Sequence, residues 1–201
     1  ALGIKNILCI TGDSVKAGDQ QDAKAVHEFE SVRLLQQIQS FNKGIDPTFG
    51  ELSDNKTFIF SGAAADPSCK NQRSLKNRMR KKKEAGARFI QTQMVMEKEN
   101  LIKFCEEISN PLEIPVIAGV FLLKSYKNAL FINKYVPGAN IPEKILNRLK
   151  DAKHPLQEGI QIAAEQAQDF INIANGIHLM AVKSEHLIPE ILKKADINLE
   201  Y

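Results

Sequence analysis

Short apolar runs alternate five times with longer segments of helical period, and this alternation constrains the fold more than any other feature of the sequence. The runs have the length and composition of β-strands. They span residues 6–11, 57–61, 88–92, 115–123 and 177–182. Segments of helical period span residues 27–41, 74–85, 97–109, 124–135, 142–150, 155–174 and 186–194. Strands that alternate with helices over short connections predict a parallel sheet with helical crossovers.

Two parallel α/β architectures fit this order. One is a (β/α)8 barrel of the TIM type, represented by about five consecutive β/α units, and the other is an open doubly wound sheet. A complete barrel needs about 250 residues, whereas this chain has 201. It starts at Ala1 and reaches a strand within a few residues, as a chain entered partway through a fold would. No linker, low-complexity segment or repeat divides it, which predicts a single domain over residues 1–201.

Composition excludes several classes of protein. Hydrophobic residues make up 43% and charged residues 25% of the chain, which excludes a disordered or collagen-like chain. No apolar run approaches the roughly 18 residues of a membrane span, and no signal peptide is recognisable. The three cysteines, Cys9, Cys69 and Cys105, form no CxxC pair, so neither a disulfide framework nor a metal site is predicted. We expect a cytoplasmic protein with no membrane partner.

The basic residues are concentrated in one segment. Residues 70–83 contain eight lysines and arginines and no acidic residue, which leaves 19 basic and 24 acidic side chains elsewhere. A local cluster of positive charge on a mildly acidic body favours a discrete anion site over a nucleic-acid surface, which would be basic over a wider area. We therefore expect no nucleic-acid partner.

Small and polar residues follow the predicted strands, where both parallel architectures form their ligand sites. In chain order they are Thr11, Gly12 and Asp13, then residues 62–67, then Thr92 and Gln93, then Gly119, Lys124 and Ser125, and finally Lys183. Asp13 could bind a heterocycle or only terminate a strand in a turn, and Gln93 could bind a ring edge or only the neighbouring backbone. No GxSxG, HExxH, GxGxxG or Walker A pattern is present, so four common enzyme classes have no support.

Two further groups have competing interpretations. Arg78, Lys81 and Lys82 lie in the middle and end of a predicted helix and could fold over a diphosphate, although a solvated helix face is the better interpretation for most of the basic segment. His178 lies within a predicted strand and is interpreted as a hydrogen-bonded core histidine rather than a catalytic one.

Six runs together resemble the methylenetetrahydrofolate reductase family. In chain order they are ILCITGD, GDQQDAKAVHEFESVRLL, GAAADP, RKKKEAGARFIQTQ, PVIAGVFLLKS and GIHLMAV. The resemblance extends over nearly the whole chain. The segment that begins at Gly12-Asp13 is similar to the corresponding segment in the branch of the family found in anaerobic bacteria. It implies the C-terminal five units of a (β/α)8 barrel that binds FAD, with FMN as an alternative. It also implies hydride transfer from NADH or NADPH to methylenetetrahydrofolate, in one-carbon metabolism and methionine biosynthesis.

The resemblance assigns roles to individual residues. Asp13 and Gln93 fall on the family's catalytic and substrate-binding positions. The positions expected to bind or border the flavin cofactor are Thr11, Gly12, Asp13, His27, Glu28, Ala65, Asp66, Arg78, Lys81 and Lys82. The family's general acid is a glutamate near the end of the first barrel strand, in a segment outside this sequence. Ala65-Asp66, Lys183 and residues 94–96 depart from the residues that are usual in the family.

The resemblance also implies partners. These are a folate, a nicotinamide nucleotide, and either further copies of the chain or a second subunit, because five strands alone would leave two open sheet edges. One alternative is a non-catalytic assembly or regulatory subunit of a larger redox complex. Another is a different parallel α/β enzyme that binds a phosphorylated ligand at the basic segment.

Overall fold

In the part of the chain that the structure describes, five parallel strands form one sheet, and their order across the sheet follows their order along the chain. The computed structural model describes residues 3–12, 22, 24, 29–52 and 56–198. The strands are β1 (Asn6–Cys9), β4 (Phe60–Ala65), β5 (Phe89–Met94), β6 (Val116–Phe121) and β7 (Gly176–Met180), in the order β1-β4-β5-β6-β7. Every neighbouring pair is parallel. The predicted parallel α/β class is therefore confirmed.

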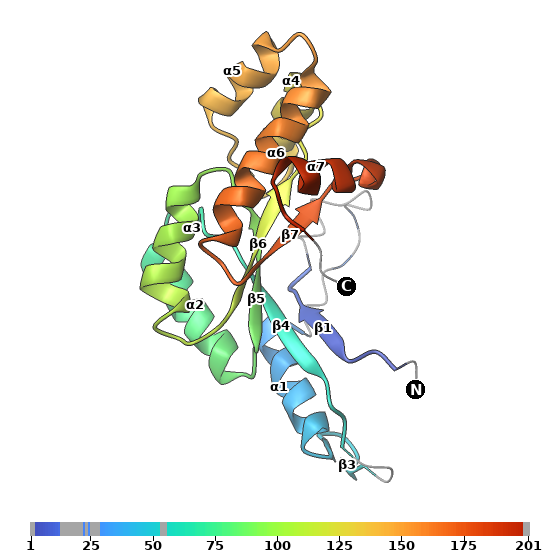
Figure 1. Cartoon of the computed structure of the whole chain (residues 1–201). Coiled ribbons are helices and arrows are strands. Elements are labelled where there is room, and N and C mark those ends of the chain that lie inside the picture. Colours follow the sequence, from blue (N-terminus) through green and yellow to red (C-terminus); the bar gives the residue numbers. More distant parts are fainter. Residues whose placement is uncertain (1–2, 13–21, 23, 25–28, 53–55, 199–201) are drawn as a thin grey trace.

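Within the described residues, seven α-helices connect and follow these strands (Figure 1). They are α1 (Ser31–Asn42), α2 (Gln72–Glu84), α3 (Lys98–Phe104), α4 (Tyr126–Tyr135), α5 (Glu143–Asp151), α6 (Pro155–Ile171) and α7 (Ile188–Lys194). A π-helical turn, Cys105–Ser109, extends α3, and a 3-10 turn, Glu185–Leu187, precedes α7. Among the described residues, no helix combines the length and the apolar character that crossing a membrane requires.

The helices cover one face of the sheet, as burial along the strands indicates. Ala63, Ile90 and Val120 are fully buried against the helices. Gln91 and His178 belong to the other face and are only half-buried. A doubly wound sheet has a strand order that reverses and helices on both faces, so the sequential order and one-sided cover are those of the TIM-barrel type. Among the described residues the five strands form an open arc with β1 and β7 at its edges.

The second strand begins and ends later than predicted. The apolar pattern places a strand at 57–61 and a loop of small residues after it, whereas β4 runs over Phe60–Ala65. The prediction was wrong about this loop because Ala63 and Ala65 are buried under helices where little side-chain volume fits. A two-stranded hairpin, β2 (Ile45–Asp46) with β3 (Gly50–Glu51), was also not predicted.

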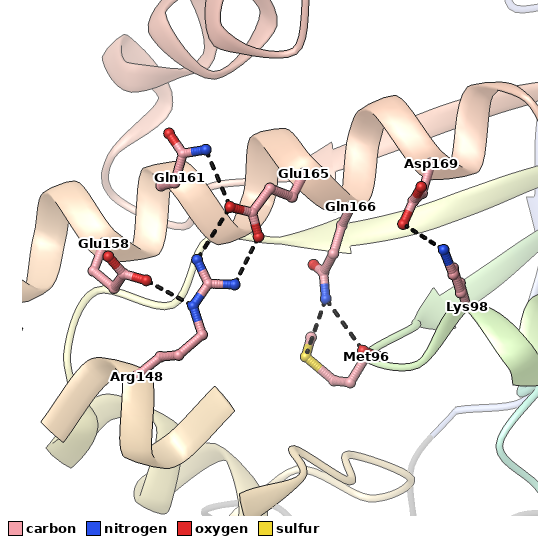
Figure 2. A network of polar contacts seen from close by, with 8 residues as sticks. All are labelled: Met96, Lys98, Arg148, Glu158, Gln161, Glu165, Gln166 and Asp169. Carbon is pink, nitrogen blue, oxygen red and sulfur yellow. Dashed lines mark hydrogen bonds and ion pairs between the residues drawn. The ribbon is translucent and has the colours of Figure 1, made fainter. Parts of the chain in front are cut away.

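The helices α4 and α5 extend beyond the end of the sheet and have their own apolar cluster (Figure 1). Arg148 of α5 ties this extension to α6 (Figure 2). Its Nε donates to Glu158 at 2.7 Å, and its Nη1 and Nη2 donate to the two carboxylate oxygens of Glu165 at 2.6 and 3.2 Å. Bidentate pairing of this kind adds a defined orientation of the two side chains to the attraction between their charges. It therefore helps to hold the loop between α4 and α5, which reaches the candidate site.

Candidate active site

A cavity of about 550 Å³ opens beside the carboxyl ends of the strands. Residues from β1, β4, β5, β7, α1 and α2 and from the α4–α5 loop line it. Leu8, Ala64 and Met180 contribute apolar surface, and the charged side chains are Glu30, Asp66, Arg78 and Lys82. The volume and the mixture of apolar surface with a few polar groups are typical of small-molecule and cofactor sites.

Thr11 connects the end of β1 to the start of α1. Its hydroxyl accepts a hydrogen bond from the backbone N–H of Ser31 at 3.1 Å. This bond satisfies one of the backbone donors that the first turn of a helix leaves unpaired. Thr11, Glu30 and Ser31 thereby form one wall of the cavity. Gly12 follows Thr11, is exposed and does not line the cavity.

Asp66 follows β4 and points its carboxylate toward two loops. Its Oδ1 accepts a hydrogen bond from the backbone N–H of Ser68 at 2.9 Å. A Cβ atom on Gly138 would lie 3.1 Å from Oδ2, so the α4–α5 loop passes directly over this carboxylate. Burial raises the pKa of Asp66, although the Ser68 N–H and the positive charge of Arg78 act in the opposite direction.

Arg78 and Lys82 form a cationic wall because they lie one helical turn apart on α2. The Nζ of Lys82 donates to the carbonyl oxygen of Ala64 at 2.7 Å. Burial lowers the pKa of Lys82, the nearby Arg78 lowers it further, and Glu30 raises it. Lys81 is exposed and does not line the cavity. The two cations beside small alanines can accept an anionic group such as a phosphate.

Gln93 lies at an irregular step in β5, where the pairing with β6 shifts between Gln91 and Met94. The hydroxyl of Thr92 donates to the Gln93 carbonyl at 2.7 Å. The Gln93 side chain accepts from the Met94 N–H at 2.8 Å and donates to the Pro137 carbonyl at 3.4 Å. Irregular steps of this kind commonly redirect a side chain beside an active site. The Gln93 amide therefore lies at the cavity rim, against the α4–α5 loop.

The sequence analysis did not single out Gln91, and it interpreted His178 as a hydrogen-bonded core histidine; the structure shows both residues lining the cavity. Gln91 Nε2 and His178 Nδ1 are 2.8 Å apart. Burial lowers the pKa of His178. The available signal was the two-residue period of a strand, because it places Gln91 with Gln93 and His178 with Met180.

The structure brings together six of the residues to which the family resemblance assigns roles. Thr11, Ala65, Asp66, Arg78, Lys82 and Gln93 all line the cavity. Asp13, His27 and Glu28 lie outside the described residues. No group of three or more potential metal ligands of the His, Cys, Asp or Glu type occurs in the part of the chain that the structure describes.

These features define a parallel α/β protein, consistent with the TIM-barrel type, with a candidate small-molecule cavity at the carboxyl ends of its strands. Residues 1–196 match the family model for methylenetetrahydrofolate reductase. The chain therefore belongs to the methylenetetrahydrofolate reductase family, as its motifs predict.

Two curated relatives match almost all of the chain. A protein of Caenorhabditis elegans named probable methylenetetrahydrofolate reductase (NADPH) is 25% identical over 96% of this chain and 28% of its own length. Methylenetetrahydrofolate reductase 2 of Schizosaccharomyces pombe is 30% identical over 97% of this chain and 32% of its own length. The chain thus spans about a third of the length of these relatives.

A solved structure supports the fold. It is a protein from Clostridium thermocellum described as binding two copies of 5-methyl-5,6,7,8-tetrahydrofolic acid. The two proteins superpose with a TM-score of 0.52 and 19% identity, over 69% of this chain and 53% of the other.

Proposed function

We propose that this protein carries out the reduction of 5,10-methylenetetrahydrofolate to 5-methyltetrahydrofolate, with a flavin cofactor and NADH or NADPH as the hydride donor. The observation that carries the proposal is the cavity at the strand ends, which gathers a cationic wall, a carboxylate and the Gln93 amide. Membership of the methylenetetrahydrofolate reductase family supports the reaction class.

The residues of the cavity fit a flat cofactor that carries phosphates. Ala64 and Ala65 leave space beside the strand ends, and Arg78 and Lys82 offer positive charge from the adjacent helix. Lys82 is half-buried with its ammonium directed at the Ala64 carbonyl. An anion near Lys82 would also compensate the burial that lowers its pKa. FAD satisfies these features, and FMN would use the same cations with fewer contacts.

A bound flavin would supply a two-electron hydride carrier that alternates between the two substrates. The protein's own residues bind the cofactor and orient the folate. Arg78 and Lys82 hold the anionic part of the cofactor, and Leu8 and Met180 exclude water. The Gln93 amide already bonds the Met94 N–H and the Pro137 carbonyl, and it positions the folate ring with its second N–H and its second lone pair. Asp13 is proposed to contact flavin and pterin, as the family resemblance implies.

The names of two similar proteins support NADPH and a folate as substrates. The Caenorhabditis elegans relative is named for NADPH, and the Clostridium thermocellum protein is described as binding a methylated tetrahydrofolate. We further propose a cytoplasmic location, which the free thiols of Cys9, Cys69 and Cys105 support. Assembly with a second copy or a second subunit is proposed because β1 and β7 each pair on one side only among the described residues.

The absorbance spectrum of the purified protein tests the proposal. After incubation with FAD and gel filtration, the protein should retain a flavin band that NADH or NADPH bleaches under anaerobic conditions. Addition of methylenetetrahydrofolate should restore the band. Protein without retained flavin and without NAD(P)H–menadione reductase activity would overturn the proposal and favour a non-catalytic subunit. Retention of a phosphosugar in place of flavin would favour a different enzyme class.

A further inference from the structure

Gln91 and His178 form a polar pair across three strands of the sheet. Gln91 belongs to β5 and His178 to β7, and β6 lies between them. Their side chains meet with the amide Nε2 2.8 Å from the ring Nδ1. Both residues line the cavity together with Leu8 and Met180. The pair therefore places polar atoms among apolar surface at a ligand site.

With the amide nitrogen of Gln91 facing the ring, the contact assigns one tautomer to His178. A carboxamide nitrogen donates hydrogen bonds and does not accept them, so Nδ1 of His178 is the acceptor and its lone pair is occupied. In a neutral imidazole the proton then resides on Nε2. Within the described parts of the chain, Nε2 has no hydrogen-bond partner. The ring thus has one free donor.

The environment keeps this ring uncharged at neutral pH. Burial lowers the pKa of His178. Positive charge at the same cavity is supplied instead by Arg78 and Lys82. A neutral N–H donor recognises an acceptor atom without attracting anions in general, which is a different task from that of the cationic wall.

We propose that His178 is a positioning residue whose Nε2–H donates to a carbonyl oxygen or ring nitrogen on the edge of a heterocycle bound in the cavity, with Gln91 fixing the donor tautomer. The proposal rests on the proposed function, which provides two such heterocycles, the flavin and the pterin. Both carry carbonyl and ring-nitrogen acceptors, and separate titrations distinguish them. A histidine that served only the core would affect folding and not recognition.

The tautomer is tested first, on the full chain without ligand. The sequence has four histidines, and ¹⁵N spectra of histidine-labelled protein report the protonation of each ring nitrogen. The His178 signals are assigned by their loss in His178→Phe. We expect a protonated Nε2 and an unprotonated Nδ1 at pH 7, and a mixture of tautomers in Gln91→Met. A proton on Nδ1, or a charged ring at pH 7, would overturn the proposal.

Recognition is tested by separate titrations with FAD and with 5-methyltetrahydrofolate. His178→Phe removes the donor and retains an aromatic ring, and we expect one of the two dissociation constants to rise about three- to tenfold. Gln91→Met should weaken the same ligand by a smaller factor. His186→Phe, at an exposed histidine outside the cavity, is the matched control and should change neither constant.

The outcomes separate this proposal from the function on which it rests. Wild-type protein that binds neither ring would overturn the proposed function and the role of Nε2 with it. Wild-type protein that binds a ring while His178→Phe binds it equally well would overturn only the role of His178. A variant that loses stability without any change in either dissociation constant would identify His178 as a core residue.

Discussion

The backbone N–H of Gly119 donates a hydrogen bond to the hydroxyl of Thr92 at 2.9 Å, and this bond joins β6 to the irregular step of β5. The same hydroxyl donates to the Gln93 carbonyl at 2.7 Å. Thr92 therefore satisfies backbone groups that regular pairing would otherwise use, and the chain can turn the Gln93 side chain toward the cavity rim. The position of Gln93 depends on a close approach of two strands at Gly119.

Gly119→Ala should disturb this approach. A Cβ atom would lie 2.8 Å from the carbonyl oxygen of Gln93 and 2.9 Å from that of Thr92, and both are backbone atoms that cannot rotate away. We expect the free energy of unfolding to fall by about 1–3 kcal/mol, as for other overpacked sites. Flavin reoxidation by methylenetetrahydrofolate should slow, because Gln93 moves. Urea denaturation and stopped-flow absorbance measure the two effects.

Gly176→Ala is the matched control, since this glycine belongs to the neighbouring strand and a Cβ atom there would meet nothing within 4 Å. Its effect on stability should stay within about 0.5 kcal/mol. Equal losses in the two variants would contradict a specific role for the close approach at Gly119.

Lys82→Met should weaken the binding of a phosphate-bearing cofactor. Lys82 lines the cavity whereas Lys81 is exposed outside it. Loss of one charge-assisted hydrogen bond, about 1.5–3 kcal/mol, corresponds to a roughly 10- to 150-fold rise in the dissociation constant of FAD. Riboflavin, which has no phosphate, should bind both proteins equally. Fluorescence titration of the two ligands measures these affinities.

Lys81→Met provides the control for this prediction and should change FAD affinity less than about twofold, because exposed charges are screened by solvent and salt. A larger loss in Lys81→Met than in Lys82→Met would show that the phosphates lie on the outer face of α2, and would contradict the cavity assignment.

The sequence predicts the parts of this molecule that depend on local pattern. Strand–helix alternation predicts the parallel sheet, and the rule that ligand sites form at strand ends leads to Thr11, Ala65 and Asp66. Gly62–Ala65 were mistaken for a loop because small residues lack the β-branched or aromatic character by which strands are recognised. Their place in β4 is set by the helices that pack on them, which is a tertiary effect.

Other features of the site depend on contacts between distant segments. Gln91 and His178 are 87 positions apart, so only the sheet register brings them together. The irregular step at Gln93 requires Gly119 on the next strand, and the residue pattern of β5 alone does not predict that contact. Recognition of such features needs the pairing of the strands, which residue spacing within one segment does not supply.

Asp66→Asn should stabilise the protein at neutral pH. Burial raises the pKa of this carboxyl above its value in the unfolded chain, so the ionised form costs stability once the pH exceeds the unfolded value. Asparagine is uncharged and retains an oxygen that can accept the hydrogen bond from the Ser68 N–H. We expect a gain below about 1 kcal/mol, because solvent and Arg78 partly stabilise the charge.

The pH dependence identifies the cause of this gain. It should be present at pH 7 and disappear as the pH falls below the ordinary pKa of an aspartate, where wild-type Asp66 is also uncharged in both states. Urea denaturation at pH 7 and near pH 3 measures it. A gain that persists at the lower pH would show that packing, and not the carboxylate charge, is responsible.

Arg148→Met should remove an acid-sensitive part of the stability. Hydrogen bonds from Arg148 hold the pKa of Glu165 below its ordinary value. Because the folded-state pKa is depressed, this stabilisation is complete above the unfolded pKa and is lost as the pH falls through the folded one. We expect a loss of about 1 kcal/mol at pH 7, limited by the half-exposed Glu165 carboxylate. The difference from wild type should shrink toward pH 3.

Arg80→Met tests whether the bidentate geometry matters. Arg80 pairs with Glu84 one turn away on α2 at 3.9 Å, and both side chains are mostly exposed. Single ion pairs of this kind contribute little, so this variant should lose less than about 0.5 kcal/mol at pH 7 and show no added pH dependence. Because Arg148 also anchors α5, only its loss should loosen the α4–α5 loop that contacts Gln93 and Asp66. Weaker folate binding in Arg148→Met, with binding unchanged in Arg80→Met, would therefore show that the ion pairs of Arg148 support the site. Equal binding in both variants would show that these ion pairs contribute only to stability.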